Sequence, residues 1–349
     1  WLPSGYGTDA KTLVLLAGGP NNTYGDTLER QSDGDWILPA GNYYLKDNIT
    51  VEYAIAISGN VTICLNGKTI TGKTATGNNT TDPVFRVEKG GKLTLKDCED
   101  TGKVTHTGDT AIYGVPAGVQ VLKGGIFNLY SGKISGNREA GVYLNDNNAG
   151  TFNLYGGEIS GNHISENQGG GVFVGSGNQF NMYGGTIQNN SAVDGGGVYI
   201  APAYNAYSAG EMTICGDAVI QGNKAGSVTN NVSLPSGKQI TISGKLVENA
   251  KIGVTTRANL SQGNVNIATA TDAGWVVAKN FTSDDPAYHV GLVNDGKTVQ
   301  LQVHSHQWEY SVSPDGTTIT AKCTAGNCDL ADSNGGSVQI VQPTGLIYD

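Results

Sequence analysis

The sequence is short of charge and of long apolar runs. Charged residues occupy 15% of its 349 positions, and acidic residues outnumber basic ones, so the formal net charge is −9. Because nucleic acids and anionic membranes are bound by clustered Lys and Arg, we expect neither kind of partner. No stretch of eighteen apolar residues occurs, so we predict no segment that inserts into a membrane.

Cysteine is scarce as well. The five residues are Cys64, Cys98, Cys215, Cys323 and Cys328, and they lack the paired spacing of a zinc site. We therefore predict no metal centre and no cofactor. Cys323 and Cys328 bracket a turn-like tetrapeptide, which favours a hairpin-closing disulfide between them over free thiols. Such a disulfide implies an oxidising, extracellular setting.

Glycine, in contrast, is abundant, with 52 residues, and much of it lies in a repeated segment. Residues 125–137 return in altered form as 150–162 and again as 178–190. Each copy leads through a polar turn to a tetrad of one pattern, of which Gly141-Val142-Tyr143-Leu144 is the first. Self-similarity at a period of about 20 to 50 residues predicts a repeat architecture.

Alignment of the copies gives three columns of apolar residues, each within a short segment of alternating polarity. The columns are Leu93, Phe127, Phe152, Phe180, Met212 and Ile240; then Ile134, Ile159, Ile187 and Ile220; then Val119, Val142, Val172, Val198 and Val232. Three strands per period, stacked in register, predict a parallel β-helix. No window has the apolar spacing of a helical solenoid, and a propeller needs four strands per blade.

The Gly-Asn turns and the Gly-Gly-Gly-Val tetrads resemble the repeats of the pectate-lyase-like β-helix superfamily, and within it those of polymorphic outer-membrane-protein-like adhesins. Residues 61–70 look like the first full coil of large surface proteins from Gram-positive gut bacteria. Residues 306–349 are similar to the start of the small β-modules that follow such helices. The resemblance implies a right-handed helix, a secreted or cell-wall-attached location, and a place within a larger multidomain surface protein.

We accordingly predict an all-β chain of three parts. Residues 1–48 form an N-terminal cap region, which covers the end of the solenoid. Residues 49–304 form the right-handed parallel β-helix, whose last, irregular coils include strands at 274–278 and 299–303. Residues 305–349 form a small β-module, the start of an Ig-like or β-grasp-like repeat.

Aromatic residues on the outer surface are the first candidates for function. In each tetrad the two aliphatic residues point into the bore, so Tyr143, Phe173 and Tyr199 point outward from successive coils. An exposed aromatic strip of this kind binds sugar rings or protein side chains, or it merely stabilises the face of the solenoid. The insertion at residues 201–209 adds Tyr204 and Tyr207 on a loop beside this strip, which favours binding.

Two other repeated sets are predicted to be structural. A second outward line lies at glycine-rich corners and consists of Tyr130, Tyr155 and Tyr183. A ladder of stacked amides is predicted from Asn137, Asn162, Asn190 and Asn223.

Three acidic residues, Glu139, Glu166 and Asp194, precede successive tetrads. If they stack, their separations bracket the carboxylate spacings of glycosidases, and they could also hold Ca²⁺. The turns that carry them differ in length, so a solvated acidic rim is the interpretation we favour.

These observations favour an adhesin-like binding module that recognises a host glycoprotein, glycan or immunoglobulin through the aromatic strip. The alternative is a carbohydrate-active enzyme, a glycoside hydrolase or polysaccharide lyase, that uses the stacked carboxylates. A third possibility is a passive stalk that displays other domains.

Overall fold

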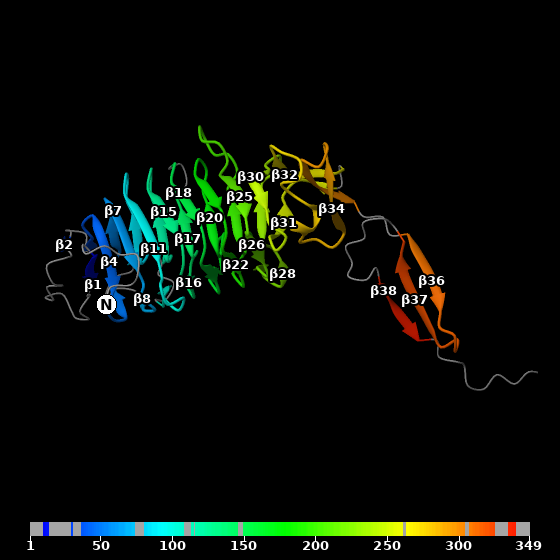
Figure 1. Ribbon diagram of the computed structural model, residues 1–349, viewed down its shortest axis with the longest axis horizontal. Helices are drawn as coiled ribbons and strands as arrows, with labels where there is room; N and C mark the ends of the chain where they lie inside the picture. Colours follow the sequence, from blue (N-terminus) through cyan, green and yellow to red (C-terminus); the bar gives the residue numbers. More distant parts are fainter. Residues whose placement is uncertain are drawn as a thin grey trace, which may run out of the picture.

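Most of the chain forms one long solenoid of stacked, three-stranded coils (Figure 1). The computed structural model describes residues 10–13, 29–30, 36–73, 80–107, 113–114, 116–145, 149–260, 263–303, 307–324 and 334–339. Within the solenoid each coil contributes one strand to each of three columns, and neighbouring coils pair in parallel. The protein is therefore an all-β parallel β-helix, as the repeated sequence predicts.

The three columns of strands define three long faces. The first contains β4 (Gly41–Leu45), β7 (Asn60–Cys64), β11 (Lys92–Lys96), β15 (Ile126–Leu129), β18 (Thr151–Leu154), β21 (Gln179–Met182), β25 (Glu211–Gly216) and β30 (Ile240–Leu246). The second contains β5 (Ile49–Val51), β8 (Thr69–Gly72), β12 (Lys103–His106), β16 (Lys133–Ser135), β19 (Glu158–Ser160), β22 (Thr186–Gln188), β26 (Val219–Gln221) and β31 (Lys251–Thr256). The third contains β3 (Trp36–Ile37), β6 (Ile55–Ile57), β10 (Phe85–Val87), β14 (Val119–Val121), β17 (Val142–Leu144), β20 (Val172–Val174), β24 (Val198–Ile200) and β29 (Val232–Leu234).

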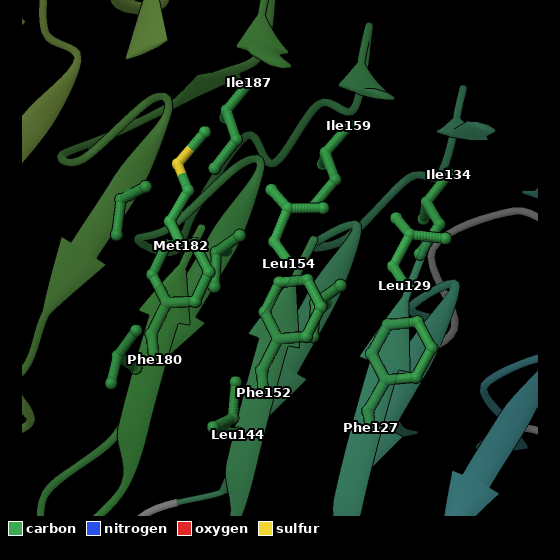
Figure 2. Packing of buried hydrophobic residues seen from close by; sticks show 14 of the residues in the cluster. Phe127, Leu129, Ile134, Leu144, Phe152, Leu154, Ile159, Phe180, Met182 and Ile187 are labelled. Atoms are coloured by element: carbon green, nitrogen blue, oxygen red, sulfur yellow. The ribbon is translucent and has the colours of Figure 1, made fainter. Parts of the chain in front are cut away.

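The bore of the solenoid is filled by the predicted apolar columns. Strand pairing places Phe127 opposite Phe152, and Phe152 opposite Phe180, as the alignment of the repeats requires. Their rings stack with centroids 5.0 Å apart, and all three are fully buried. Figure 2 shows these rings following one another along the axis, with the aliphatic side chains of the other columns beside them. The uneven repeat lengths are absorbed by the turns, so the strands keep their register.

The predicted asparagine ladder is confirmed, and it is longer than expected. Asn137, Asn162 and Asn190 each donate from the side-chain amide to the asparagine carboxamide oxygen of the next coil, and Asn223 donates likewise to Asn231 of its own coil, over 2.7 to 3.0 Å. At the far end, Asn231 donates from its side chain and its backbone to the carboxylate of Asp284, at 2.6 Å each. The ladder ties the turns between the second and third faces together.

Both ends of the solenoid depart from the regular pattern. At the start, β1 (Ala10–Leu13) pairs in parallel with β4, and β2 (Glu29–Arg30) pairs antiparallel to β3. At the far end, β33 (Phe281–Ser283) extends the stack in parallel, whereas β35 (Thr298–Val303) pairs antiparallel to both β32 (Val265–Ala270) and β34 (Tyr288–Val293). The predicted strand at 299–303 is thus confirmed.

The predicted strand at 274–278 is wrong. The chain makes a turn there and enters a short 3₁₀ helix, Ala278–Asn280. The amide of Asn280 donates to the backbone oxygens of Val247 and Ala250 on the preceding coil, and its oxygen accepts from the backbone N–H of Val277. This hydrogen bonding replaces strand pairing, and the period-two pattern of the sequence gives no sign of it.

Smaller sheets complete the described structure. Outside the three columns, a two-stranded sheet contains β9 (Thr80–Thr81) and β13 (Tyr113–Gly114). A three-stranded sheet contains β23 (Ser191–Ala192), β27 (Lys224–Ala225) and β28 (Val228–Thr229). An antiparallel sheet of β36 (Trp308–Val312), β37 (Thr318–Cys323) and β38 (Asn334–Gln339) follows the solenoid (Figure 1). The predicted domain boundaries, and the comparison of this last sheet with an Ig-like or β-grasp-like repeat, stay predictions.

Candidate binding surfaces

The predicted aromatic strip exists as a stack of rings on the third face. Tyr143 pairs in register with Phe173, and Phe173 with Tyr199. The ring centroids are 4.7 and 5.5 Å apart, and the ring planes differ by 10° and 11°. The aliphatic neighbours of each ring point into the bore, so all three rings lie outside it. We call these three residues the packed aromatic row.

This row is not the exposed strip that the sequence predicts. Phe173 is only 8% exposed, and Tyr143 and Tyr199 are half-buried. The rings form a second, small apolar cluster that also contains Ala140, Ile164, Ala192 and Ala201, all of them buried. The expectation of an exposed strip fails because the turns between the second and third faces carry apolar residues that fold back over it.

Arg257 closes the end of the packed aromatic row. Its guanidinium carbon lies 4.3 Å from the centroid of the Tyr199 ring, where a cation is attracted by the ring's negative face. One nitrogen of the same group lies 3.7 Å from the carboxylate of Asp194, and another donates to the backbone oxygen of Ile200. Tyr199 and Asp194 are therefore both engaged by one side chain from a later coil.

The tyrosines of the predicted loop are exposed and well anchored. Tyr204 and Tyr207 are 58% and 42% exposed. Their backbones exchange two hydrogen bonds, of 3.2 and 3.0 Å, which close a tight hairpin whose turn holds Asn205 at a φ of 53°. Gly177 on the neighbouring turn donates to the backbone oxygen of Ser208 at 2.9 Å. We call residues 202–208 the tyrosine hairpin, and it presents its rings from a fixed backbone.

A second stack of rings, which the sequence suggested to be structural, is the exposed one. Tyr130, Tyr155 and Tyr183 are 44%, 39% and 37% exposed, and their ring centroids are 4.4 and 4.8 Å apart. Partial burial, and then its two tyrosine neighbours, raise the pKa of the Tyr155 hydroxyl. The Lys96 ammonium lies 5.2 Å from the Tyr130 centroid at the other end. We call these three residues the tyrosine row.

Glycine explains why the tyrosine row stays uncovered. Two residues after each tyrosine, Gly132, Gly157 and Gly185 turn the chain with φ values of 86°, 81° and 84°, a conformation that other residues rarely adopt. A Cβ on Gly157 would lie only 2.6 Å from the backbone oxygen of Gly132. These corners are too tight to carry side chains over the rings, so the glycines that suggested a structural role in the sequence are the reason that the tyrosines are exposed.

Beside the tyrosine row, the first face carries a row of amides. Asn153 donates to Asn128 at 2.8 Å, Asn181 donates to Asn153 at 2.9 Å, and Asn128 donates to Thr94 at 3.3 Å. Each asparagine lies two residues before its tyrosine and therefore on the same side of the strand. The tyrosine hairpin precedes β25 directly and contacts the turn before β21, so it rises at the opposite end of the same strands. The first face therefore has the tyrosine row at one end of its strands and the single tyrosine hairpin at the other end.

The three acidic residues have different surroundings, and a joint catalytic role for them stays a prediction. Burial raises the pKa of Glu139, with a further increase from the charge of Glu166 and an opposing hydrogen bond from Asn167. Asp194 instead interacts with Arg257 and accepts a hydrogen bond of 2.8 Å from the backbone of Gly195. The residues that the structure describes contain no cluster of three His, Cys, Asp or Glu arranged for a metal. Glu139, Glu166 and Asp194 therefore do not form such a cluster for Ca²⁺ in the described residues. The expectation that the protein has no cofactor stays a prediction.

The predicted disulfide cannot be placed. Cys323 lies at the end of β37, whereas Cys328 is outside the described residues. The pairing stays a prediction.

Comparisons of the chain with protein-family models, with curated proteins and with solved structures found no match. In the part of the chain that the structure describes, no helix is long and apolar enough to cross a membrane. The fold is established by strand pairing, and the choice of function depends on the surfaces described above.

Proposed function

We propose that this protein is an adhesin-like binding module, related to the pectate-lyase-like β-helix repeats of Gram-positive gut bacteria and displayed outside the cell as part of a larger surface protein. Its ligand is a host glycan, carried by a glycoprotein such as mucin or by an immunoglobulin. The observation that carries the proposal is the first face, which has the exposed tyrosine row at one end of its strands and the exposed tyrosine hairpin at the other end.

The chemistry of this face suits a carbohydrate. Tyr204 and Tyr207 offer ring surface against which the C–H faces of a sugar pack, and the phenolic hydroxyls of both sets of tyrosines donate and accept hydrogen bonds. From Gln179 to Tyr183 the strand advances by about 13 Å, enough for two or three sugar rings. The formal net charge of −9 gives no support to a nucleic acid as ligand.

Preorganisation supports the same proposal. The asparagine row, the stacked rings and the hairpin hydrogen bonds hold the face in one arrangement before any ligand arrives. Little side-chain entropy is then lost on binding. In flexible sites this loss of entropy reduces the affinity. The exposed apolar residues of the last sheet, Tyr310, Val312 and Val338, support a place within a larger protein, because neighbouring domains commonly cover such patches.

The test is a binding screen of the full 349-residue chain on glycan arrays, mucin and serum immunoglobulin. The double variant Tyr204→Ala, Tyr207→Ala and the triple variant Tyr130→Ala, Tyr155→Ala, Tyr183→Ala should each weaken the observed binding by about tenfold or more. Tyr310→Ala, in the last sheet and 67% exposed, is the matched control and should leave binding unchanged. A chain that binds none of these ligands, or whose variants bind as before, refutes the proposal and favours a passive stalk.

A carbohydrate-active enzyme remains the second candidate, since the raised pKa of the half-buried Glu139 beside Glu166 suits a general acid. On this alternative, Glu139 protonates the leaving oxygen of a glycosidic bond and Glu166 acts as the second carboxylate. Release of reducing sugar or an unsaturated product from a glycan panel, abolished by Glu139→Gln, would place this candidate first. Binding without turnover would discard it.

A further inference from the structure

The corner between the first and second faces contains a cavity at the C-terminal end of the tyrosine row. Between the aligned core residues of the two faces, this corner consists of residues 183–186 on the last coil of the row. It is longer on the next coil, at residues 215–219, and longest on the coil after that, at residues 243–251. A cavity of about 540 Å³ lies among the three corners, within the range of about 300 to 1,000 Å³ that is usual for ligand pockets. We call it the corner hollow.

Hydrogen bonds between coils hold the corner hollow in shape. The backbone oxygen of Gly185, which lines it, accepts from the N–H of Val219 at 3.1 Å. The backbone oxygen of Gly216 accepts from the N–H of Val247 at 2.9 Å, which fixes the longest corner to the coil before it. The oxygen of Val247 in turn accepts from the side-chain amide of Asn280 at 3.0 Å. The lining is therefore fixed before any ligand arrives.

Tyr183 offers an open ring face beside the corner hollow. It is the last ring of the tyrosine row, and its other face stacks on Tyr155 with the centroids 4.8 Å apart. In register the next coil carries Cys215 in place of a fourth ring. At the opposite end of the row, Lys96 lies near the terminal ring, Tyr130. Because neighbouring coils lie about 4.8 Å apart, a sugar stacked on Tyr183 would lie level with the coil that lines the hollow.

Polar side chains of the corner hollow are left without partners. Three lining residues have no hydrogen bond or ion pair from the side chain among the residues that the structure describes: Thr186, Asp217 and Asn249. By contrast Glu158, the register partner of Thr186, forms an ion pair with Lys133 at 3.1 Å. A Cβ on Gly184 would lie 2.3 Å from Oδ1 of Asp217, so this carboxylate lies against the residue that directly follows Tyr183. The unpaired groups thus lie next to the open ring face.

We propose that the corner hollow is a subsite for one neutral sugar residue, the end of a glycan whose preceding ring stacks on Tyr183. The Asp217 carboxylate and the Asn249 carboxamide hydrogen-bond to neighbouring hydroxyl groups of this sugar, and the exposed Val247 packs against its C–H face. An acidic sugar, such as a sialic acid, is disfavoured because its charge would be repelled by the carboxylate. The inference rests on the glycan-binding function proposed above and gives that function a specificity.

The test is calorimetric titration of the full chain with a neutral oligosaccharide that binds on a glycan array, and with the same oligosaccharide extended by a terminal sialic acid. The double variant Asp217→Ala, Asn249→Ala should bind the neutral form about tenfold or more weakly. Its melting temperature should stay constant, since both side chains are exposed and unpaired. Asp47→Ala, an exposed carboxylate in the same corner of an early coil, is the matched control and should bind as the unmodified chain does. Asp217→Asn should reduce the preference for the neutral form.

The outcomes separate this inference from the function on which it rests. Binding that is weakened by the tyrosine variants but not by Asp217→Ala, Asn249→Ala overturns the subsite and leaves the proposed function standing. Binding that depends on the corner hollow but not on the tyrosines supports the subsite and refutes the proposed role of the tyrosines. A chain that binds only sialylated glycans overturns the subsite, and a chain that binds no glycan refutes both.

Methyl NMR of a valine-labelled chain gives a second measurement, which locates the sugar directly. Saturation with the neutral oligosaccharide should shift the methyl resonances of Val247, which is 43% exposed and lines the corner hollow. Those of Val303, which is 54% exposed on β35, should stay unchanged. Binding without a shift at Val247 overturns the proposal.

Discussion

The packed aromatic row and the tyrosine row have the same construction and opposite surroundings. Each consists of three rings, one per coil, stacked at 4.4 to 5.5 Å on the outer side of three successive strands. The first lies beneath turns that carry Ile164 and Ala192, and the second lies beside corners made of glycine. The comparison teaches that the strands place an aromatic residue outside the bore, but the turn that follows decides whether it reaches solvent.

The largest expected effect distinguishes the two rows by stability. Phe173→Ala leaves a void between two rings and beneath the turns, and should reduce the free energy of unfolding by about 3 kcal/mol. Tyr155→Ala, the equivalent central ring of the tyrosine row, loses stacking but little burial and should cost about 1 kcal/mol. Urea unfolding of both variants measures the difference. Equal losses would mean that the rows do not differ as described.

A smaller effect concerns the charge at the end of each row. Arg257→Ala removes the cation from the Tyr199 ring, the hydrogen bond to Ile200 and the contact with Asp194, so we expect a loss of about 1 to 2 kcal/mol. Lys96→Ala removes only an exposed cation near Tyr130 and should cost about 0.5 kcal/mol. Thermal melts at low and high salt test this, because only the Lys96 contribution should disappear with salt.

Glu139, next to Ala140 of the packed cluster, provides a test through pH. Burial raises its pKa, so the folded protein binds the proton more tightly than the unfolded chain does. The ionised group therefore lowers stability above its ordinary pKa, and this cost disappears when the pH falls below that value. Glu139→Gln should raise the melting temperature at pH 7 but not at pH 3. The exposed Glu52→Gln, on a coil far from Glu139, is the control, and a lower melting temperature for Glu139→Gln at pH 7 would contradict the burial argument.

The smallest effect separates the ring from its hydroxyl in the tyrosine row. Tyr155→Phe keeps the stack, so its free energy of unfolding should change by less than about 0.5 kcal/mol. If the hydroxyl contacts the glycan, affinity should fall several-fold while stability stays constant. Titration calorimetry against the ligand found in the screen, beside a urea melt, measures both. Unchanged affinity would restrict the contact to ring surface.

The sequence predicts the strands of the solenoid well and its surfaces poorly. Period-two alternation and the repeated segments are local signals, so they give the registers of Phe127, Phe152 and Phe180 correctly. Exposure depends on how turns of unequal length fold back, and Ile164 is the one apolar residue in its turn that signals the cover over Phe173. The capping by Arg257 and Asp284 has no local signal at all, because each contacts residues far earlier in the chain.

The aligned carboxamides of the asparagine ladder give the solenoid a net dipole along its axis. Every carboxamide from Asn137 to Asn231 is oriented alike, with its N–H group toward the C-terminal end, so their dipoles add as peptide dipoles do in an α-helix. The positive end of this array faces the carboxylate of Asp284, and the negative end is the buried oxygen of Asn137, which has no hydrogen-bond partner among the described residues. The positive end of the array stabilises an anion. A further coil with an aligned asparagine beyond Asn231 would lengthen the dipole, and its positive end would again be stabilised by a carboxylate.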